Sequence, residues 1–376
     1  MTYSVHQHWD PLKVCAVGRS YPPEFYKFIK NSRVRDVMEK IATQTEEDYQ
    51  KLIKLLESFG VEIVRTDFVD DPIFHDGSII PPPMCPRDWT AMIGNSFHLQ
   101  RKTNQIWENI KGIDWPEFPE TRSEFDNLSP AIKTELERFN NTHWFNFTDP
   151  FYPGLKSIED IVKHQGNSIY HTGINSAMTI RVGKDLFFGT ESLTQNQTEL
   201  LNLRKQQFPD YRCHVVNSGG HIDGIFCPVV PGLVFTIPTD FNYKELFPEW
   251  EIVTLYDPGL RSIKPFMDLK EKNQGKWWVP GEEDNTDFTE FVNQWFYNWV
   301  GFVEETVFDV NMLVIDEKNV VCSNYNEEVF KVFDRYGITP HIVKLRHRYF
   351  WDGGLHCLTS DLHREGTQKD YFPKKG

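Results

Sequence analysis

The stretch NMLVIDEKNVVCSNYNEEVFKVFDRYGITPHIVKL, residues 311–345, holds one complete folding pattern in a single run. Two short apolar runs surround a polar turn, which predicts a β-hairpin. Val329, Phe330 and Phe333 share one face of the helix that follows, and Gly337 marks the C-terminal end of that helix. A second apolar run after Gly337 predicts a returning strand. The predicted order is therefore strand, strand, helix, strand.

The same order recurs in the preceding part of the chain. Residues 221–256 contain a hairpin around Pro231-Gly232, a short helix and a strand. Residues 176–217 contain a hairpin around a Gly-Lys-Asp turn, then a helix and a strand. Residues 88–100 predict another hairpin, with a long and irregular continuation.

A fifth unit is divided between the two ends of the chain. LKVCAVGR (12–19) predicts a strand, residues 34–60 form the longest amphipathic helical pattern, and residues 61–67 predict another strand. The missing first strand can be supplied by HCLTSDLHR (356–364).

Five such units predict an α/β fold in which one domain, residues 1–376, forms a closed β/α barrel of pseudo-fivefold symmetry. Closure removes free sheet edges, and stacked units share one core. The alternative is a doubly wound sheet with a dinucleotide site. It is disfavoured because no G-x-G-x-x-G follows a predicted strand.

Composition and charge exclude several classes of protein. The formal net charge is −14, which disfavours a nucleic-acid partner but suits a cationic substrate. Hydrophobic residues make up 39% of the chain and mean hydropathy is −0.50, as expected for a soluble globular protein. No apolar run is long enough to cross a membrane, and the first residues resemble no secretory signal. A cytoplasmic location with reduced thiols is expected.

Each predicted unit places a polar residue at or just before its first strand. Because equivalent positions lie at the same end of a ring, these side chains are expected to converge on an axial pocket. The steps from Asn175 to His221 and from Asn311 to Cys357 are both 46 residues, as related units would have. The five residues are Asp88, Asn175, His221, Asn311 and Cys357.

Cys357 is the strongest candidate for a nucleophile. It follows Gly353-Gly354 and adjoins His356, and Gly219-Gly220 precede His221 in the same way. Glycines of this kind permit a close backbone approach to a ligand. A Cys and a His from different units can then act together as nucleophile and proton carrier.

The other cysteines have plainer interpretations. The six cysteines are scattered without a CxxC pair, which disfavours a zinc site, and none is expected to bind metal. Four of them lie inside apolar strand patterns and are expected to be packing residues: Cys15, Cys213, Cys227 and Cys322.

Several motifs, in this order, resemble the guanidino-group modifying enzymes, and within them the amidinotransferases. The motifs are HWDPLKVCAVGR (8–19), PRD (86–88), GGHID (219–223), NMLVIDEK (311–318) and GGLHCLTSDLHREGT (353–367). The resemblance covers nearly the whole chain. It implies the pentein fold, a five-bladed β/α-propeller around an axial pocket.

The resemblance also implies a ping-pong mechanism. Cys357 would attack the guanidinium carbon of a donor such as arginine, and His221 would serve as acid and then as base. Asp88 and Asp223 would hold the guanidinium nitrogens, with Asp223 also orienting His221. The partners would be a small guanidino donor and an acceptor amine, without metal or organic cofactor, and a homodimer is compatible with this picture.

The substrate-binding positions implied by the same match are Asn175, Asn311, Gly220 and His356. Two of the family's features differ here. Asn175 stands where the family usually carries an acid, and its amide brings no charge. The segment Ile237–Phe241 lacks the Arg with which glycine-using members bind a carboxylate. Glycine is therefore not assigned as the acceptor.

Two alternatives follow from the same residues. One is a hydrolase of the same fold, in which water replaces the acceptor amine. The other is a non-catalytic ligand-binding descendant, which Asn175 would suit. The presence of both His221 and Cys357 counts against that reading.

Overall fold

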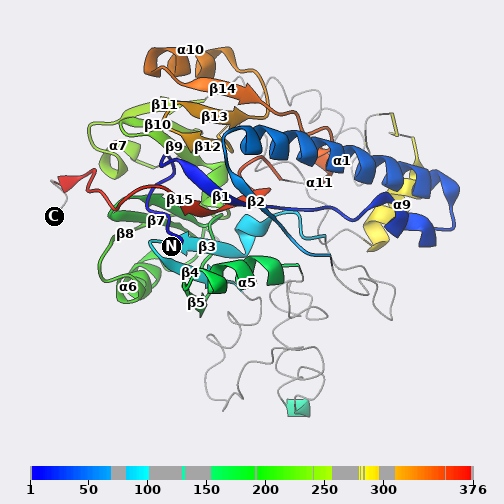
Figure 1. Ribbon diagram of the computed structural model, residues 1–376, viewed down its shortest axis with the longest axis horizontal. Coiled ribbons are helices and arrows are strands. Elements are labelled where there is room, and N and C mark those ends of the chain that lie inside the picture. Colours follow the sequence, from blue (N-terminus) through cyan, green and yellow to red (C-terminus); the bar gives the residue numbers. More distant parts are fainter. Residues whose placement is uncertain are drawn as a thin grey trace.

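The computed structural model describes most of the chain, and its strands form five small sheets surrounded by helices (Figure 1). The described residues are 2–68, 82–100, 129–131, 154–190, 193–239, 241–255, 279, 281–282, 284–295, 310–351 and 353–373. The irregular continuation predicted after residue 100 lies largely outside them.

The described strands are β1 (Leu12–Val17), β2 (Glu62–Arg65), β3 (Thr90–Ile93), β4 (Ser96–Leu99), β5 (Ser168–His171), β6 (Thr179–Val182), β7 (Asp185–Gly189), β8 (Arg212–Val216), β9 (Phe226–Val230), β10 (Leu233–Thr236), β11 (Glu251–Thr254), β12 (Leu313–Asp316), β13 (Asn319–Cys322), β14 (Thr339–Ile342) and β15 (Thr359–Arg364). The described helices are α1 (Ser32–Ser58), α5 (Lys156–His164), α6 (Gln197–Gln207), α7 (Tyr243–Leu246), α9 (Thr286–Trp295), α10 (Glu327–Tyr336) and α11 (Arg348–Trp351). Three short 3-10 helices are η1 (Pro23–Phe28), η2 (Pro86–Asp88) and η3 (Ile222–Gly224).

The five sheets repeat one topology. Each has an antiparallel pair of strands, and its third strand lies parallel to the middle one; the orders are β15-β1-β2, β3-β4-β5, β6-β7-β8, β9-β10-β11 and β12-β13-β14. The divided unit is confirmed, because β1 pairs with β15 from the far end of the chain.

The predicted closed barrel is wrong. The described strands hydrogen-bond within five separate three-stranded sheets rather than around one continuous sheet. At the centre, side chains of β15, of β6 and of the segment before β3 bond to one another, whereas the described strands of different sheets form no ladder.

The segment 311–345 folds as its pattern predicts. β12 and β13 form the hairpin, and β14 lies parallel to β13. The side chain of Asn326 accepts the N–H groups of Glu328 and Val329, which begins α10. Gly337 ends this helix at φ 68°, a left-handed conformation that costs glycine little.

Helices cover the outer faces of the sheets. In Figure 1, α1, α5, α6, α7 and α10 lie around the periphery of the strands. α1 buries an apolar stripe that includes Met38, Ile41, Leu52 and Leu56 in one large core cluster. The first strands of the sheets lie on the inner side, away from these helices, and form the centre of the molecule.

Asp361 of β15 occupies that centre and binds three arginines. Arg364 lies on the same strand, Arg181 lies on β6, and Arg87 lies in η2 just before β3. Its carboxylate oxygens lie 3.1 Å from Arg87 Nη2, 2.8 Å from Arg181 Nη2 and 2.8 Å from Arg364 Nε. All four side chains are almost completely buried. Burial alone would raise the pKa of Asp361, but Arg181, Arg364 and Arg87 hold it well below its usual range.

The same arginines also bind backbone carbonyls of neighbouring sheets. Arg181 Nη1 donates to Met92 O at 2.7 Å, in β3. Arg364 Nη2 donates to Val314 O at 2.9 Å, in β12. The centre is therefore a charged hydrogen-bonded hub that joins four of the five sheets.

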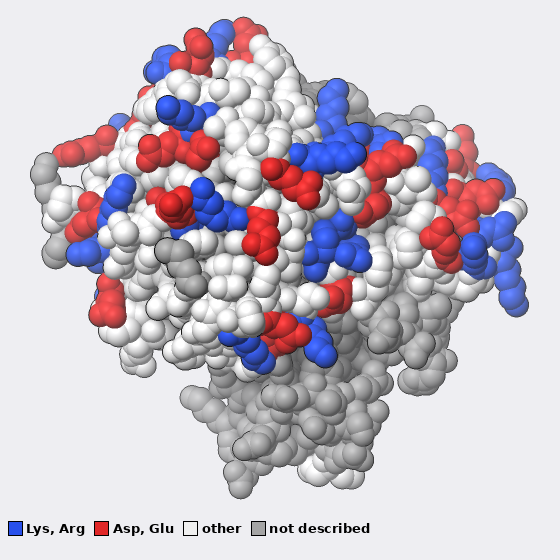
Figure 2. Space-filling view, viewed as in Figure 1, with Lys and Arg blue, Asp and Glu red and all other residues white. Residues whose placement is uncertain are grey.

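The face shown in Figure 2 carries acidic and basic side chains interspersed with one another rather than in one extended basic patch among the described residues. Within the described ranges, no helix combines the length and apolar character needed to cross a membrane.

We expect Asp361→Asn to lower the free energy of unfolding by about 3–5 kcal/mol, because it leaves three buried guanidinium groups without their counter-charge. Urea unfolding would measure the loss. Glu327→Gln, which breaks the exposed Glu327–Lys331 pair on α10, should cause no measurable change. Equal stability of Asp361→Asn and the parent protein would show that the hub is not needed.

Candidate active site

Cys357 lies in the turn that leads into β15, where two side chains contact its sulfur. Asn311 Nδ2 donates to Sγ at 3.1 Å, and Asp223 Oδ2 lies 3.8 Å from Sγ. The cysteine is only 2% exposed. Three of the predicted site residues are thus brought into direct contact, although Asn311 and Asp223 come from two other units.

The turn that carries Cys357 is also held from the side of the central hub. Arg87 Nε donates to His356 O at 2.6 Å and to Thr359 O at 2.8 Å. These charge-assisted bonds fix the backbone on both sides of Cys357. The buried ion cluster and the candidate nucleophile therefore share one arginine.

Asp223 and His356 form a buried pair beside the sulfur. Asp223 Oδ2 lies 2.7 Å from His356 Nδ1. Burial, followed by the charge of Arg87, lowers the pKa of His356 well below its usual range. We therefore treat the ring as neutral, with its Nδ1–H donating to the carboxylate. The family resemblance implied that Asp223 orients His221, whereas the structure bonds Asp223 to His356.

His221 and Asp88 form a second pair, which is more open to solvent. His221 Nδ1 lies 3.9 Å from Asp88 Oδ1, and their side chains are 28% and 26% exposed. His221 immediately precedes η3, which contains Asp223. Because both side chains are partly exposed, this pair suits a proton carrier that a substrate can reach.

Backbone hydrogen bonds join the three segments that carry the remaining predicted residues. Ser176 N donates to Arg87 O at 3.1 Å, and Ile222 N donates to Ala177 O at 2.9 Å. The segments around Asp88, Asn175 and His221 are therefore neighbours, as their equivalent positions predict.

Asn175 is buried and uses both ends of its amide within the protein. Its Oδ1 accepts Met178 N at 2.8 Å, and its Nδ2 bonds Gln100 Oε1. Gly220 adjoins open space, since no atom lies within 4 Å of where a Cβ would be. Substrate binding by these two residues stays a prediction.

Sequence reasoning assigned no role to His8, although HWD was among the motifs it used. His8 Nε2 accepts the N–H of Arg181 at 3.2 Å, and its ring lies 5.6 Å from that of His356. Burial and then Arg181 lower the pKa of His8 well below its usual range, consistent with a neutral acceptor. His8 thus connects the hub to the His356 side of the site.

Two strand histidines make structural hydrogen bonds, and the cysteines predicted to be packing residues are buried. His214 bonds Asp185 at 2.7 Å, and His341 bonds Asn319 at 2.9 Å. The four predicted packing cysteines are buried. No group of three or more metal-binding side chains is found among the residues that the structure describes.

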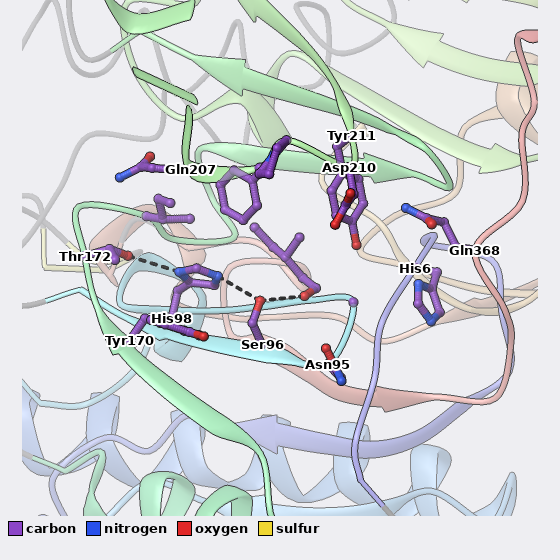
Figure 3. A pocket seen from close by; sticks show the side chains of 15 residues that line it. His6, Asn95, Ser96, His98, Tyr170, Thr172, Gln207, Asp210, Tyr211 and Gln368 are labelled. Atoms are coloured by element: carbon purple, nitrogen blue, oxygen red, sulfur yellow. Dashed lines mark hydrogen bonds between the residues drawn. The ribbon is translucent and has the colours of Figure 1, made fainter. Parts of the chain in front are cut away.

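A separate cavity of about 620 Å³ lies at the far end of β3 from Asp88 (Figure 3). The turn between β3 and β4 forms one wall, and the loop after α6 forms another. The His98 ring lies in this cavity, stacked at 5.5 Å on Tyr170, with its two nitrogens bonded to Ser96 and Thr172. None of the predicted site residues lines the cavity.

Comparison with known proteins reveals relatives along the whole chain, although no family model matches it. Mitochondrial glycine amidinotransferase of Gallus gallus is 25% identical over 98% of this chain and 84% of its own length. The putative inosamine-phosphate amidinotransferase 2 of Streptomyces griseus is 21% identical over 98% of both chains.

Solved structures agree on the fold. SxtG, an amidinotransferase of the saxitoxin biosynthetic pathway from Microseira wollei, has a TM-score of 0.61 at 16% identity, covering 99% of this chain and 100% of its own. Inosamine-phosphate amidinotransferase StrB1 of Streptomyces griseus has a TM-score of 0.60 at 17% identity, covering 98% of this chain and 99% of its own.

Along nearly its whole length the chain is therefore similar to amidinotransferases, and it shares its fold with solved amidinotransferase structures. The named relatives are amidinotransferases, so the enzyme class predicted from the sequence is confirmed.

The buried imidazole of His98 predicts an acid-sensitive step in stability. Burial and then Arg204 lower its pKa to about 4. As pH falls below the unfolded value near 6.5, only the unfolded state binds the proton, so the unfolding free energy falls until about pH 4. We expect His98→Gln to reduce this slope by up to about 1.4 kcal/mol per pH unit.

Urea titrations at several pH values between 4.5 and 7 would measure this slope. His164→Gln, which removes an exposed imidazole from α5, is the matched control. If His98→Gln and the parent protein have the same slope, the folded protein accommodates a charged His98.

Proposed function

We propose that the chain transfers an amidino group from a guanidino donor, arginine in the simplest case, to an acceptor amine through an amidino-cysteine at Cys357. The observation that carries this proposal is the contact of the Cys357 sulfur with Asn311 and Asp223, two residues from other units. A packing cysteine would have no need of such polar neighbours.

In the first half reaction, the Cys357 thiolate attacks the guanidinium carbon and forms a C–S bond. His221 protonates the departing nitrogen as the C–N bond to the donor breaks, which releases an amine such as ornithine. In the second half reaction, His221 removes a proton from the acceptor amine. That amine attacks the amidino carbon, the C–S bond breaks, and the thiolate is restored.

Asp88 and Asp223 supply the negative charge that a guanidinium ion requires. A planar guanidinium presents several N–H donors, which carboxylates accept in charge-assisted hydrogen bonds. Asp88 is partly exposed and can meet an incoming substrate, whereas Asp223 is buried beside the sulfur. We propose that the donor's guanidinium lies between them.

The five sheets support a more specific view of the fold, in which they are five blades around an axial pocket. The first strands β15 and β3 are neighbours, and the Asp361 hub joins them to β6 and β12. The polar residues before these strands then share one end of the axis, where the substrate would bind.

The cytoplasmic location and the homodimer stay predictions. The vertebrate relatives are named mitochondrial enzymes, so the relationship does not decide the compartment.

The proposal predicts a trapped adduct. After rapid quenching with arginine, mass spectrometry should find one amidino group on the peptide containing Cys357. Cys357→Ser should lack the adduct and lose turnover by at least about a thousandfold, because the nucleophile is removed. Adducts on another residue, or near-normal activity of Cys357→Ser, would overturn the mechanism.

The released products distinguish transfer from hydrolysis. Ornithine release that depends on an added acceptor amine supports amidino transfer. Citrulline and ammonia formed without an amine would instead identify a hydrolase of the same fold.

Asn175→Asp tests the missing family acid. The new carboxylate should accept a charge-assisted bond where Asn175 offers a neutral one, so arginine should bind more tightly or form the adduct faster, by about 1–2 kcal/mol. Gln100 can turn its amide toward the carboxylate, which should preserve the fold. Single-turnover adduct formation would measure this effect, and identical rates and affinities would remove Asn175 from the donor site.

A further inference from the structure

The geometry points to Asn311 as the positioning residue of the nucleophile, which aims the Cys357 sulfur and stabilises its thiolate form instead of binding substrate. This inference rests on the proposed function, in which Cys357 is the nucleophile. Asn311 is 6% exposed, and its carboxamide contacts two consecutive residues of the nucleophile turn.

Three hydrogen bonds determine which way the carboxamide faces. Asn311 Oδ1 accepts the backbone N–H of His356 at 2.9 Å and that of Cys357 at 3.3 Å. Backbone N–H groups can only donate, so they select the oxygen end of the amide. The NH₂ end must then face the sulfur, where Nδ2 lies 3.1 Å from Sγ.

A sulfur that receives an N–H donor is favoured as the anion. A charged acceptor makes a hydrogen bond roughly twice as strong as a neutral one, so this contact stabilises thiolate more than thiol. The donor is needed at this position because the Asp223 carboxylate lies 3.8 Å from the sulfur and opposes a second negative charge. Asn311 Nδ2 also lies 3.4 Å from Asp223 Oδ2, so it sits within reach of both acceptors.

Gly354 provides the space for this arrangement. A Cβ at this position would lie 2.2 Å from Asn311 Oδ1, which is well inside contact distance. A Cβ at Gly353 would lie 3.2 Å from Cys85 Sγ. The glycine pair before His356 therefore accommodates protein side chains, rather than the close approach of a ligand that the sequence suggested.

The pH dependence of Cys357 alkylation tests this role directly. Iodoacetamide labelling is followed on the Cys357 peptide by mass spectrometry, which separates it from the other five cysteines. Asn311→Asp keeps the oxygen that accepts the backbone N–H groups but replaces the donor with an acceptor. We expect the midpoint of its alkylation profile to move to higher pH, with a rate at pH 7 at least about tenfold lower.

Two further variants separate this role from a general loss of structure. Gly354→Ala displaces the carboxamide without changing its chemistry, and should move the midpoint in the same direction. Asn196→Asp makes the same change of side chain at the exposed N-cap of α6, where Asp also caps, and should leave the profile unchanged. Urea unfolding of each variant shows whether the fold is retained.

Kinetics separate positioning from substrate binding. If Asn311 positions the sulfur, Asn311→Asp should slow adduct formation at saturating arginine while the half-saturating concentration changes little. A raised half-saturating concentration with an unchanged alkylation profile would overturn the inference and restore a substrate-binding role. Unshifted profiles in both Asn311→Asp and Gly354→Ala would also overturn it.

This experiment is independent of the transfer reaction. If the parent protein forms no adduct with arginine, the proposed function fails. The alkylation profiles would still report whether Asn311 controls the Cys357 sulfur.

Discussion

The buried carboxylate of Asp361 is the constraint on which the rest of the molecule depends. The described strands pair within their own three-stranded sheets, so contacts other than strand ladders must unite the five sheets. One carboxylate that binds three guanidinium groups helps to do this, and further N–H groups of Arg181 and Arg364 donate to carbonyls of neighbouring strands. Charges this deeply buried require an opposite charge beside them, which couples the arrangement of the sheets to a single cluster. Arg87 belongs to this cluster and also binds His356 O, so it connects the cluster to the turn that carries Cys357.

Much of the fold could be predicted because local sequence patterns determine its hairpins and helices. The hairpin and helix of residues 311–337 are bounded by a polar turn, an Asn cap and a Gly stop, each of which acts within a few residues. The division of one unit between the chain ends was also recoverable, since the other units showed which strand was missing. The closed barrel was wrong because strand patterns do not reveal whether neighbouring sheets are joined by backbone or by side chains.

The sequence predicted which positions form the candidate site, but not which side chains contact each other there. Equivalent places before the first strands identified Asn311 and Cys357, and the structure brings both into contact with Asp223. Which carboxylate meets which imidazole depends on how the units pack, and residues so far apart in sequence carry no local signal of it. Asp223 therefore meets His356, and the glycines before His356 make room for Asn311 rather than for a ligand.

The pairing of β1 with β15 has a consequence for the order of folding. These strands lie near opposite ends of the chain, so their contact closes a very long loop, and such contacts tend to form late because the entropy of closure precedes any gain. β15 carries Asp361, and the turn just before it carries Cys357. Pairing of β15 with β1 thus brings both Asp361 and Cys357 into place. A partly folded chain in which β15 has not yet paired with β1 has no assembled nucleophile, so reactivity and completed architecture arise together.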